Sequence, residues 1–482
     1  MKGAVCFSEA TLSYSTSASD FISSALDRLR ALTQRSVQTT WRCWDGDLPT
    51  AQALSEWHTW TIADLNAKEH VAWSKGEQVR WFGQAIVVPQ TLEGYPLQGL
   101  CLRLALMWWA IEAQIFVNGQ LVQEGDLFDC STRLLLSDAV APGEEIAIVL
   151  RLVSPGHDDG ALVRSTCLYE SLDGFPEPSF VADELAVLHT YLQALSPEQL
   201  DTLAEAIGQI DWAMQSDRAA FDHNLAQLRQ QLLPLAEPVK QRQIQLIGHA
   251  HLDMAWLWTV DETWQAAERT FESVLSLQQD FPELTFCHST PALYEWIEQN
   301  RPDLFERIRQ QVAAGTWEPV GGLWVEPELN LIGGEAIVRH ILYGQRYFQE
   351  KFGDINRIAW LPDTFGFNWQ LPQFLKQGGI EYFVTQKLRW NDTTQFPHEI
   401  FQWQAPDQSQ VLGVMSAPIG EGIDPIKMAT YACEWENKTG MPQSLWLPGV
   451  GDHGGGPTRD MLELARRWQR SPFFPEVEFT TA

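Results

Sequence analysis

The sequence predicts a mixed β and α/β architecture: a β-rich sandwich, a helical connector, and an alternating β/α region that forms a parallel sheet or a barrel. At 482 residues the chain is too long for one ordinary domain. Its apolar periodicity also changes twice, first from short alternating runs to helical spacing, and then to strands alternating with helices. We therefore place the three regions at residues 1–180, 181–240 and 241–482.

The first region reads as an antiparallel sandwich that follows a short helix near residues 21–32. Asn118 and Gly119 separate two apolar runs, which predicts a two-residue hairpin of type I′. Proline and glycine punctuate the other connections. The candidate strands, which are short apolar or alternating runs, lie at 80–88, 99–106, 113–117 and 146–153.

The second region is predicted to be helical because leucines recur at spacings of three and four residues. One such run extends from Leu185 to Leu195, and similar runs follow to about residue 236. Ser196 and Pro197 read as the start of a helix, with proline at its first position. This pattern indicates a connector between two domains.

The third region alternates between strands and helices, which is typical of a parallel sheet or barrel covered by helices. Ligand sites in such folds collect at the carboxyl ends of the strands. The predicted strands are 243–251, 284–288, 317–325, 357–361, 382–386, a hairpin over 400–415, 445–450 and 477–480. The predicted helices are 259–279, 292–300, 302–314, 334–352, 370–377 and 459–467.

Composition excludes several classes of function. With 33 basic and 62 acidic residues the net charge is −29, which disfavours nucleic acid and anionic membranes as partners. The 7 cysteines are scattered and form no CxxC pair, so we expect neither a disulfide framework nor a thiolate zinc site. Without a secretory signal or membrane segment in this sequence, we expect a cytoplasmic location. The 22 tryptophans suit either a sugar-binding cleft or an ordinary core.

The first chemical motif is His249-Ala-His251-Leu-Asp253, which follows an apolar strand. Alternate residues of an extended chain point to one side, so two imidazoles and a carboxylate are expected to converge there. These groups suit zinc or a similar divalent ion. Structural polar residues at a strand end are the alternative.

The second and third motifs also follow predicted strands. Asp363 stands in Trp360-Leu-Pro-Asp363-Thr-Phe-Gly, where it is a candidate metal ligand, nucleophile or helix cap. His453 stands in a loop with many glycines, which are expected to let a histidine approach a metal. Phosphate binding is the alternative, but the loop lacks the lysine of a phosphate-binding motif.

Weaker candidates occur in other loops of the third region, where they could equally be ordinary surface residues. The stretch with Trp324 and Glu326 contains indoles and carboxylates. The stretch with Trp390, Asp392 and His398 contains an indole, a carboxylate and an imidazole, and a third loop has two carboxylates. The residues are Trp324, Glu326, Trp390, Asp392, His398, Glu421 and Asp424.

Together these stretches resemble glycoside hydrolase family 38, the class II α-mannosidases, and most of all its cytosolic/vacuolar branch. The resemblance begins near residue 243 and continues to the end of the chain. It is carried by five ordered motifs, which are Gly248–Asp253, Val320–Glu326, Trp360–Gly366, Thr385–Trp390 and Gly451–Pro457. It implies a seven-stranded, barrel-like β/α catalytic domain at 241–482, and a retaining α-mannosidase that acts on mannose-containing oligosaccharides.

The resemblance also implies roles for individual residues. Zinc, or cobalt in this branch, would be held by His251, Asp253, Asp363 and His453, with His249 as a neighbour. Asp363 would also be the nucleophile of a retaining mechanism. For the general acid the leading candidates are Glu421 and Asp424, followed by Asp392. Candidate substrate-binding residues are Trp324, Glu326, Trp390 and His398.

Members of the family are longer than this chain. The resemblance therefore implies that the chain is a truncated or split product, and that its partner is a downstream polypeptide. Two alternatives to the α-mannosidase stay open. One is another zinc-dependent carbohydrate hydrolase or deacetylase, in which Asp363 is only a ligand or base. The other is an inactive fragment that binds sugar.

Overall fold

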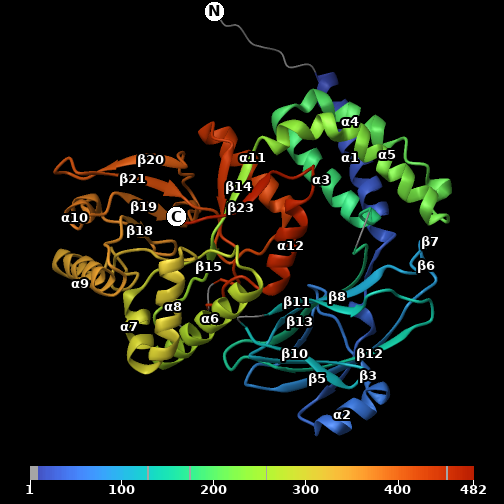
Figure 1. Cartoon of the computed structure of the whole chain (residues 1–482), viewed down its shortest axis with the longest axis horizontal. Coiled ribbons are helices and arrows are strands. Elements are labelled where there is room, and N and C mark those ends of the chain that lie inside the picture. Colours follow the sequence, from blue (N-terminus) through green and yellow to red (C-terminus); the bar gives the residue numbers. More distant parts are fainter. Residues whose placement is uncertain (1–8, 128–129, 173–174, 257, 452–453) are drawn as a thin grey trace, which may run out of the picture. The chain divides into compact units, whose positions relative to one another are not determined.

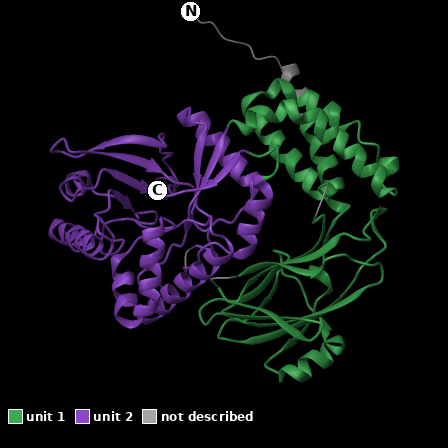
Figure 2. Ribbon diagram, viewed as in Figure 1, with its two compact units in different colours: residues 1–241, 470–474 green, residues 242–469, 475–482 purple. Residues whose placement is uncertain are grey.

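The structure is a computed structural model that describes residues 9–127, 130–172, 175–256, 258–451 and 454–482. The chain divides into two units, coloured green and purple in Figure 2. The first unit comprises residues 1–241 and 470–474, and the second comprises 242–469 and 475–482. Each unit is described by itself below.

Two antiparallel sheets form the β-rich part of the first unit (Figure 1). The rings of Trp73 in one sheet and Phe82 in the other lie 5.6 Å apart, so the sheets meet through their apolar faces. One sheet contains β1 (Gln34–Ser36), β4 (Val71–Trp73), β8 (Cys101–Trp109), β11 (Ser131–Ser137) and β13 (Gly160–Glu170). The other contains β2 (Arg42–Asp45), β3 (Thr61–Ile62), β5 (Val79–Val87), β9 (Glu112–Val117), β10 (Gln120–Gly125) and β12 (Glu145–Val153).

The hairpin predicted at Asn118 and Gly119 is confirmed. Val117 of β9 pairs with Gln120 of β10, which leaves a two-residue loop. Both loop residues have positive φ, 49° for Asn118 and 80° for Gly119. This is the backbone that a type I′ turn requires, and Asn-Gly is its preferred sequence. A further small hairpin joins β6 (Thr91–Leu92) and β7 (Tyr95–Pro96).

The helices of the first unit follow the predicted leucine spacing. The buried carboxylate of Glu184 receives two hydrogen bonds from Arg229, at 2.7 and 2.8 Å, and one from Ser471 at 2.6 Å. These bonds tie the segment 470–474 to the first unit. The helices are α1 (Glu9–Ala31), α2 (Thr50–Glu56), α3 (Pro178–Leu195), α4 (Leu200–Ile207) and α5 (Arg218–Lys240). They share a unit with the sheets, and the predicted boundary at residue 180 stays a prediction.

The second unit alternates strands and helices, as predicted. Its strands form three sheets whose pairings are parallel apart from β20–β21. In order along the sheets they are β22 (Gln443–Trp446), β14 (Gln243–Leu246) and β23 (Glu476–Phe479); β15 (Gly248–His249), β16 (Phe286–His288) and β17 (Trp317–Pro319); and β18 (Ile358–Trp360), β19 (Tyr382–Thr385), β21 (Gln410–Met415) and β20 (Ile400–Gln404).

The helices of the second unit connect these strands (Figure 1). Helix α6 begins with a capping box, in which Thr259 and Glu262 satisfy each other's backbone N–H groups. The helices are α6 (Val260–Asp280), α7 (Pro291–Asn300), α8 (Pro302–Ala314), α9 (Gly334–Phe352), α10 (Leu371–Gln377), α11 (Pro425–Thr439) and α12 (Arg459–Gln469). Within the described parts of the chain, no helix combines the length and apolar character needed to cross a bilayer.

Candidate active site

The carboxyl ends of several parallel strands of the second unit open into one cavity of about 710 Å³. His251 and Asp253 follow β15, Asp363 follows β18, and Lys387 follows β19. The cavity therefore lies where the ligand sites of open and closed β/α folds are found. Its lining consists of His251, Leu252, Asp253, Met254, Trp256, Thr290, Glu326, Glu328, Asp363, Thr364, Phe365, Gln386, Lys387, Arg389, Trp390, Pro418, Ile419 and Glu421.

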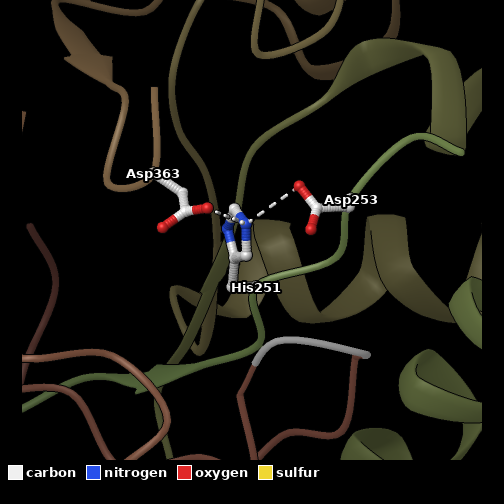
Figure 3. Close-up of side chains that lie close together, drawn as sticks. All are labelled: His251, Asp253 and Asp363. Atoms are coloured by element: carbon white, nitrogen blue, oxygen red, sulfur yellow. Dashed lines mark ion pairs between the residues drawn. The ribbon is translucent and has the colours of Figure 1, made fainter. Parts of the chain in front are cut away.

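Three predicted metal ligands come together in this cavity. Figure 3 shows the carboxylates of Asp253 and Asp363 turned towards the ring of His251. The Nε2 atom of His251 lies 3.4 Å from Oδ1 of Asp253 and 3.7 Å from Oδ2 of Asp363. One ligand atom from each residue lies within 4.8 Å of the others. Residues 112 positions apart thus meet because parallel strands present their ends at one edge.

These side chains form a site with an excess of negative charge. The ring of His251 is 5% exposed, and a third carboxylate, Glu326, lies 3.9 Å from its Nδ1. Burial by itself lowers the pKa of His251, but the carboxylates of Asp253, Glu326 and Asp363 raise it to about 9. Carboxylates gathered in a poorly hydrated site need a compensating positive charge. Either an imidazolium or a bound cation can supply it.

The residues present fit a divalent metal ion. The Nε2 atom of His251 is buried and has no hydrogen-bond partner among the described residues. A buried polar nitrogen left without a partner is unfavourable unless something else binds it. One imidazole nitrogen and two carboxylates are a donor set that zinc or a similar ion accepts.

The other histidine of the first motif is used differently. The indole N–H of Trp360 donates to Nε2 of His249 at 3.0 Å, which occupies the lone pair that a metal would need. Burial lowers the pKa of His249 well below its usual value, so the ring is neutral. Of the two imidazoles in this motif, only that of His251 belongs to the group of possible metal ligands among the described residues. Alternation along a strand predicts the side of the chain on which each imidazole lies, but it does not predict which residue hydrogen-bonds to that imidazole.

Glu326 fixes the position of the Asp363 loop. Its Oε1 atom accepts hydrogen bonds from the backbone N–H groups of Asp363 and Thr364, at 2.8 and 2.7 Å, and from the Thr364 hydroxyl at 3.0 Å. Burial raises the pKa of Glu326. The nearby His251 and these hydrogen bonds act in the opposite direction, but the net pKa is still raised. The Glu326 side chain thus holds the loop that carries Asp363 through one oxygen, and its other oxygen faces the ring of His251.

Lys387 forms the positive side of the site. Its Nζ atom lies 2.5 Å from Oδ1 of Asp363, and its side chain is 4% exposed. The ammonium also lies 3.5 Å from the ring centre of Trp390 and 4.0 Å from that of Phe365, which are cation–π distances. The two oxygens of Asp363 are therefore distinguished, because Oδ1 faces the lysine and Oδ2 faces His251.

Backbone strain occurs next to the same cavity. Ala255 has a φ of 61° and Thr290, at the start of α7, has a φ of 76°. A β-branched residue in the left-handed region is a genuine outlier. Such strain is found most often at functional sites, where the surrounding structure holds it in place.

The glycine-rich loop approaches the first motif closely. The N–H of Gly454 donates to the carbonyl oxygen of His251 at 2.8 Å. A Cβ atom on Gly449 would lie 1.9 Å from the carbonyl oxygen of His249, so only glycine fits without movement of the backbone. His453, the predicted fourth ligand, lies outside the described residues.

We expect Gly449→Ala to lower the free energy of unfolding by about 1–3 kcal/mol or more, because the two backbones must separate. The melting temperature should fall by several degrees. Gly333→Ala is the matched control, since a Cβ atom there meets nothing within 4 Å. Thermal unfolding followed by circular dichroism compares the two, and equal stability of the variants would contradict the close approach.

The remaining predicted residues lie in different places. Glu421 lines the cavity and pairs with Lys427 at 2.9 Å, whereas the carboxylate of Asp424 caps helix α11. Trp390 lines the cavity and is 64% exposed. Trp324 is absent from the cavity lining and packs edge-on against Tyr347. Asp392 and His398 line a second cavity, described below.

Sequence reasoning did not identify Lys387 as a site residue. Lys387 lies within the motif Thr385–Trp390, but nothing in its sequence context indicates an ion pair with Asp363. His288 ends β16 and is buried, and burial lowers its pKa to about 4, but it is absent from the lining of the cavity.

The second half of the chain is similar to known proteins. Residues 241–482 match the family described as Glycosyl hydrolases family 38 N-terminal domain. The chain is 37% identical to Alpha-mannosidase G of Dictyostelium discoideum over 243 residues, and 39% identical to human Alpha-mannosidase 2C1 over 246 residues. Each match covers 50% of this chain but only 22% and 23% of those proteins. An alpha-mannosidase from Enterococcus faecalis is a structural match with a TM-score of 0.41 and 22% identity, over 50% of this chain and 28% of that one.

Proposed function

This chain belongs to glycoside hydrolase family 38, and from that membership we propose that it is a metal-dependent retaining α-mannosidase acting on terminal α-mannosides of oligosaccharides. The observation that carries the proposal is the cluster of His251, Asp253 and Asp363 in an open cavity. Asp363 is the only one of the three that is also held by a lysine within the described residues. That arrangement suits a carboxylate with a chemical role beyond ligation.

Asp363 is the proposed nucleophile. It would attack the anomeric carbon of a bound mannoside and form a glycosyl ester, which water then hydrolyses. Lys387 and the loop held by Glu326 orient its carboxylate, and burial of the lysine limits the water that competes for it. Trp390 and Phe365 present exposed ring faces on which a pyranose can pack.

Glu421 is our first choice for the general acid because it lines the same cavity as Asp363. Its carboxylate pairs with the ammonium of Lys427 at 2.9 Å, and this ion pair must open before Glu421 can act on a leaving group. Asp424 is the second choice, but its carboxylate already accepts hydrogen bonds from two backbone N–H groups of α11.

His251, Asp253 and Asp363 are the proposed metal ligands, with His453 as the fourth, and zinc or cobalt as the ion. When bound, such an ion supplies a positive charge that orients sugar hydroxyls and stabilises the charge of the transition state. The residues of the chain contribute one neutral imidazole nitrogen and two carboxylate oxygens, already gathered within 4.8 Å.

We also propose that the three sheets of the second unit belong to one seven-stranded barrel. A single buried cluster takes residues from six strands or their ends, and the partly buried Val414 of a seventh strand packs against it; the six are Ile247, Cys287, Val320, Trp360, Val384 and Leu447. Separate sheets are linked by the hydrogen bond from Gly321 N to Ile358 O and by the bridge between Glu421 and Pro448. The family match from residue 241 and the unit boundary after Gln241 support a domain that begins there.

Release of p-nitrophenol from p-nitrophenyl α-mannoside tests the proposed activity. We expect the chain, supplied with zinc or cobalt, to hydrolyse this substrate and to leave the β-mannoside intact. Proton NMR of the first sugar product should show the α-anomer, as a retaining mechanism requires. The β-anomer as first product would exclude Asp363 as a nucleophile, and cleavage of neither anomer would contradict the proposed activity.

Lys387→Met should lower kcat/KM for the aryl mannoside by about 10- to 100-fold, because a charge-assisted contact contributes about 1.5–3 kcal/mol. Methionine keeps most of the apolar volume between Trp390 and Phe365. We expect Lys387→Arg to recover part of the loss, and the metal content of both variants to equal that of the parent. Lys351→Met is the control for loss of a lysine, since Lys351 pairs with Glu298 at 2.7 Å, lies 5.9 Å from the ring centre of Tyr347 and is absent from the lining of the cavity. A parent-like rate for Lys387→Met would contradict the orienting role.

A further inference from the structure

A second cavity of about 430 Å³ lies beside the first in the same unit. The two cavities adjoin at Arg389, which lines both of them. The second cavity has a volume within the range of known ligand sites, which is about 300–1,000 Å³. Its lining is largely polar and includes Asn391, Thr394, His398 and Lys438.

Arg389 is held by a buried carboxylate. Glu399 is 7% exposed, and its two oxygens contact Arg389 at 2.5 Å and Lys438 at 2.7 Å. Arg389 also donates to the carbonyl oxygen of Ser416. These contacts hold the guanidinium in one place, so the junction between the cavities is rigid before any ligand arrives.

The opposite side of the cavity is an ordered loop. The side-chain oxygen of Asn391 accepts hydrogen bonds from the N–H groups of Thr393 and Thr394, at 3.1 and 2.9 Å, which forms an Asx turn. The exposed ring of His398 packs edge-on against Phe396, with ring centres 5.9 Å apart. Hydroxyl, amide and imidazole groups are thus presented to solvent from a fixed backbone.

The chemistry of this lining selects the ligand. Glu399 pairs with both Arg389 and Lys438, and Glu434 and Asp392 bring the lining to three carboxylates against these two cations, so the cavity does not suit an anion. Hydroxyl, amide and imidazole groups, together with one aromatic ring, suit a neutral ligand with many hydroxyl groups. A sugar ring has this character.

We propose that the second cavity binds a further sugar residue of the oligosaccharide whose terminal mannose occupies the first cavity. The inference rests on the proposed function and extends it, because it makes the enzyme selective for oligosaccharides over simple mannosides. Arg389 would be the contact common to both sugar residues. The expected gain in affinity from one or two neutral hydrogen bonds is about three- to tenfold.

Calorimetric titration with thio-linked α-mannotriose tests this inference, because its sulfur bridges resist hydrolysis and binding is measured without turnover. Methyl α-mannoside is titrated in parallel as a ligand for the first cavity alone. We expect mannotriose to bind the parent chain at least threefold more tightly than methyl mannoside. The advantage should disappear in His398→Ala, which removes a donor, and in Thr394→Trp, which fills the cavity.

His58→Ala is the matched control for the histidine variant. His58 is also exposed and also packs edge-on against an aromatic neighbour, Trp57, at 6.1 Å, but it lies in the first unit. It should keep the preference for mannotriose. Equal affinity of the parent for the two ligands, or an advantage retained in both cavity variants, overturns the inference. Failure of the proposed function is seen separately, as tight binding of mannotriose without hydrolysis of p-nitrophenyl α-mannoside.

Discussion

Asp363→Asn should lower kcat for p-nitrophenyl α-mannoside by on the order of 10⁴-fold, as expected when a group essential to the chemical step is removed. An amide carries no negative charge and is a poor nucleophile towards an anomeric carbon. The substitution also removes the ion pair with Lys387 and one proposed metal ligand. Activity and metal content must therefore be measured together.

Two further measurements separate the chemical role of Asp363 from ligation. Incubation of the parent with a fluorinated α-mannosyl fluoride should leave a covalent adduct, which mass spectrometry should locate on the peptide that contains Asp363. Asp407→Asn is the control, since Asp407 is an exposed aspartate that accepts hydrogen bonds from Ser409 and is absent from the lining of the cavity. An adduct on a different carboxylate would reassign the nucleophile. Release of acetate from acetylated sugars, with no adduct, would instead favour the deacetylase alternative.

Removal of metal with a chelator should abolish hydrolysis, and addition of zinc or cobalt should restore it. The buried Nε2 of His251 and the neighbouring carboxylates then regain the cation that balances their charge. At a free zinc concentration 100 times the dissociation constant, binding adds about 2.7 kcal/mol to the stability of the folded state. The melting temperature should therefore rise by several degrees when zinc is added.

Ligand variants test the same site without an activity measurement. We expect His251→Ala and Asp253→Ala to lose the zinc-dependent rise in melting temperature, and to contain far less metal by elemental analysis. His58→Ala, which lies in the other unit, should keep both. If the two ligand variants bind zinc as the parent does, the metal site lies elsewhere in the chain.

Local sequence patterns were sufficient for many of the elements, although not for α11 or β13, and for part of the site. Asn118 and Gly119 predicted their hairpin because few residue pairs tolerate two positive φ angles in succession. The positions of His251, Asp253 and Asp363 after apolar strands predicted that they would lie near one another, because parallel strands end at one edge. Their roles as ligands and nucleophile stay predictions.

Contacts between residues that are far apart in the sequence could not be predicted in the same way. Strand spacing treats His249 and His251 alike, and only the family resemblance named His251 as the ligand. In the structure Trp360, which is 111 positions from His249, donates to the ring of His249. Lys387 belongs to the site only because β18 and β19 are neighbours, which brings its ammonium to Asp363. Asp424 looked like a candidate acid in sequence, but it begins a helix and its carboxylate caps it.

The sequence by itself therefore determined the family, the alternation of strands and helices in the second unit, and which strand ends carry reactive side chains. These properties depend on residue type and on spacing along the chain. Only the tertiary structure decided which imidazole is free to bind a cation, which lysine meets the central aspartate, and where a second cavity lies. Those features depend on distances of a few ångströms between segments far apart in sequence, and such distances cannot be inferred from spacing along the chain.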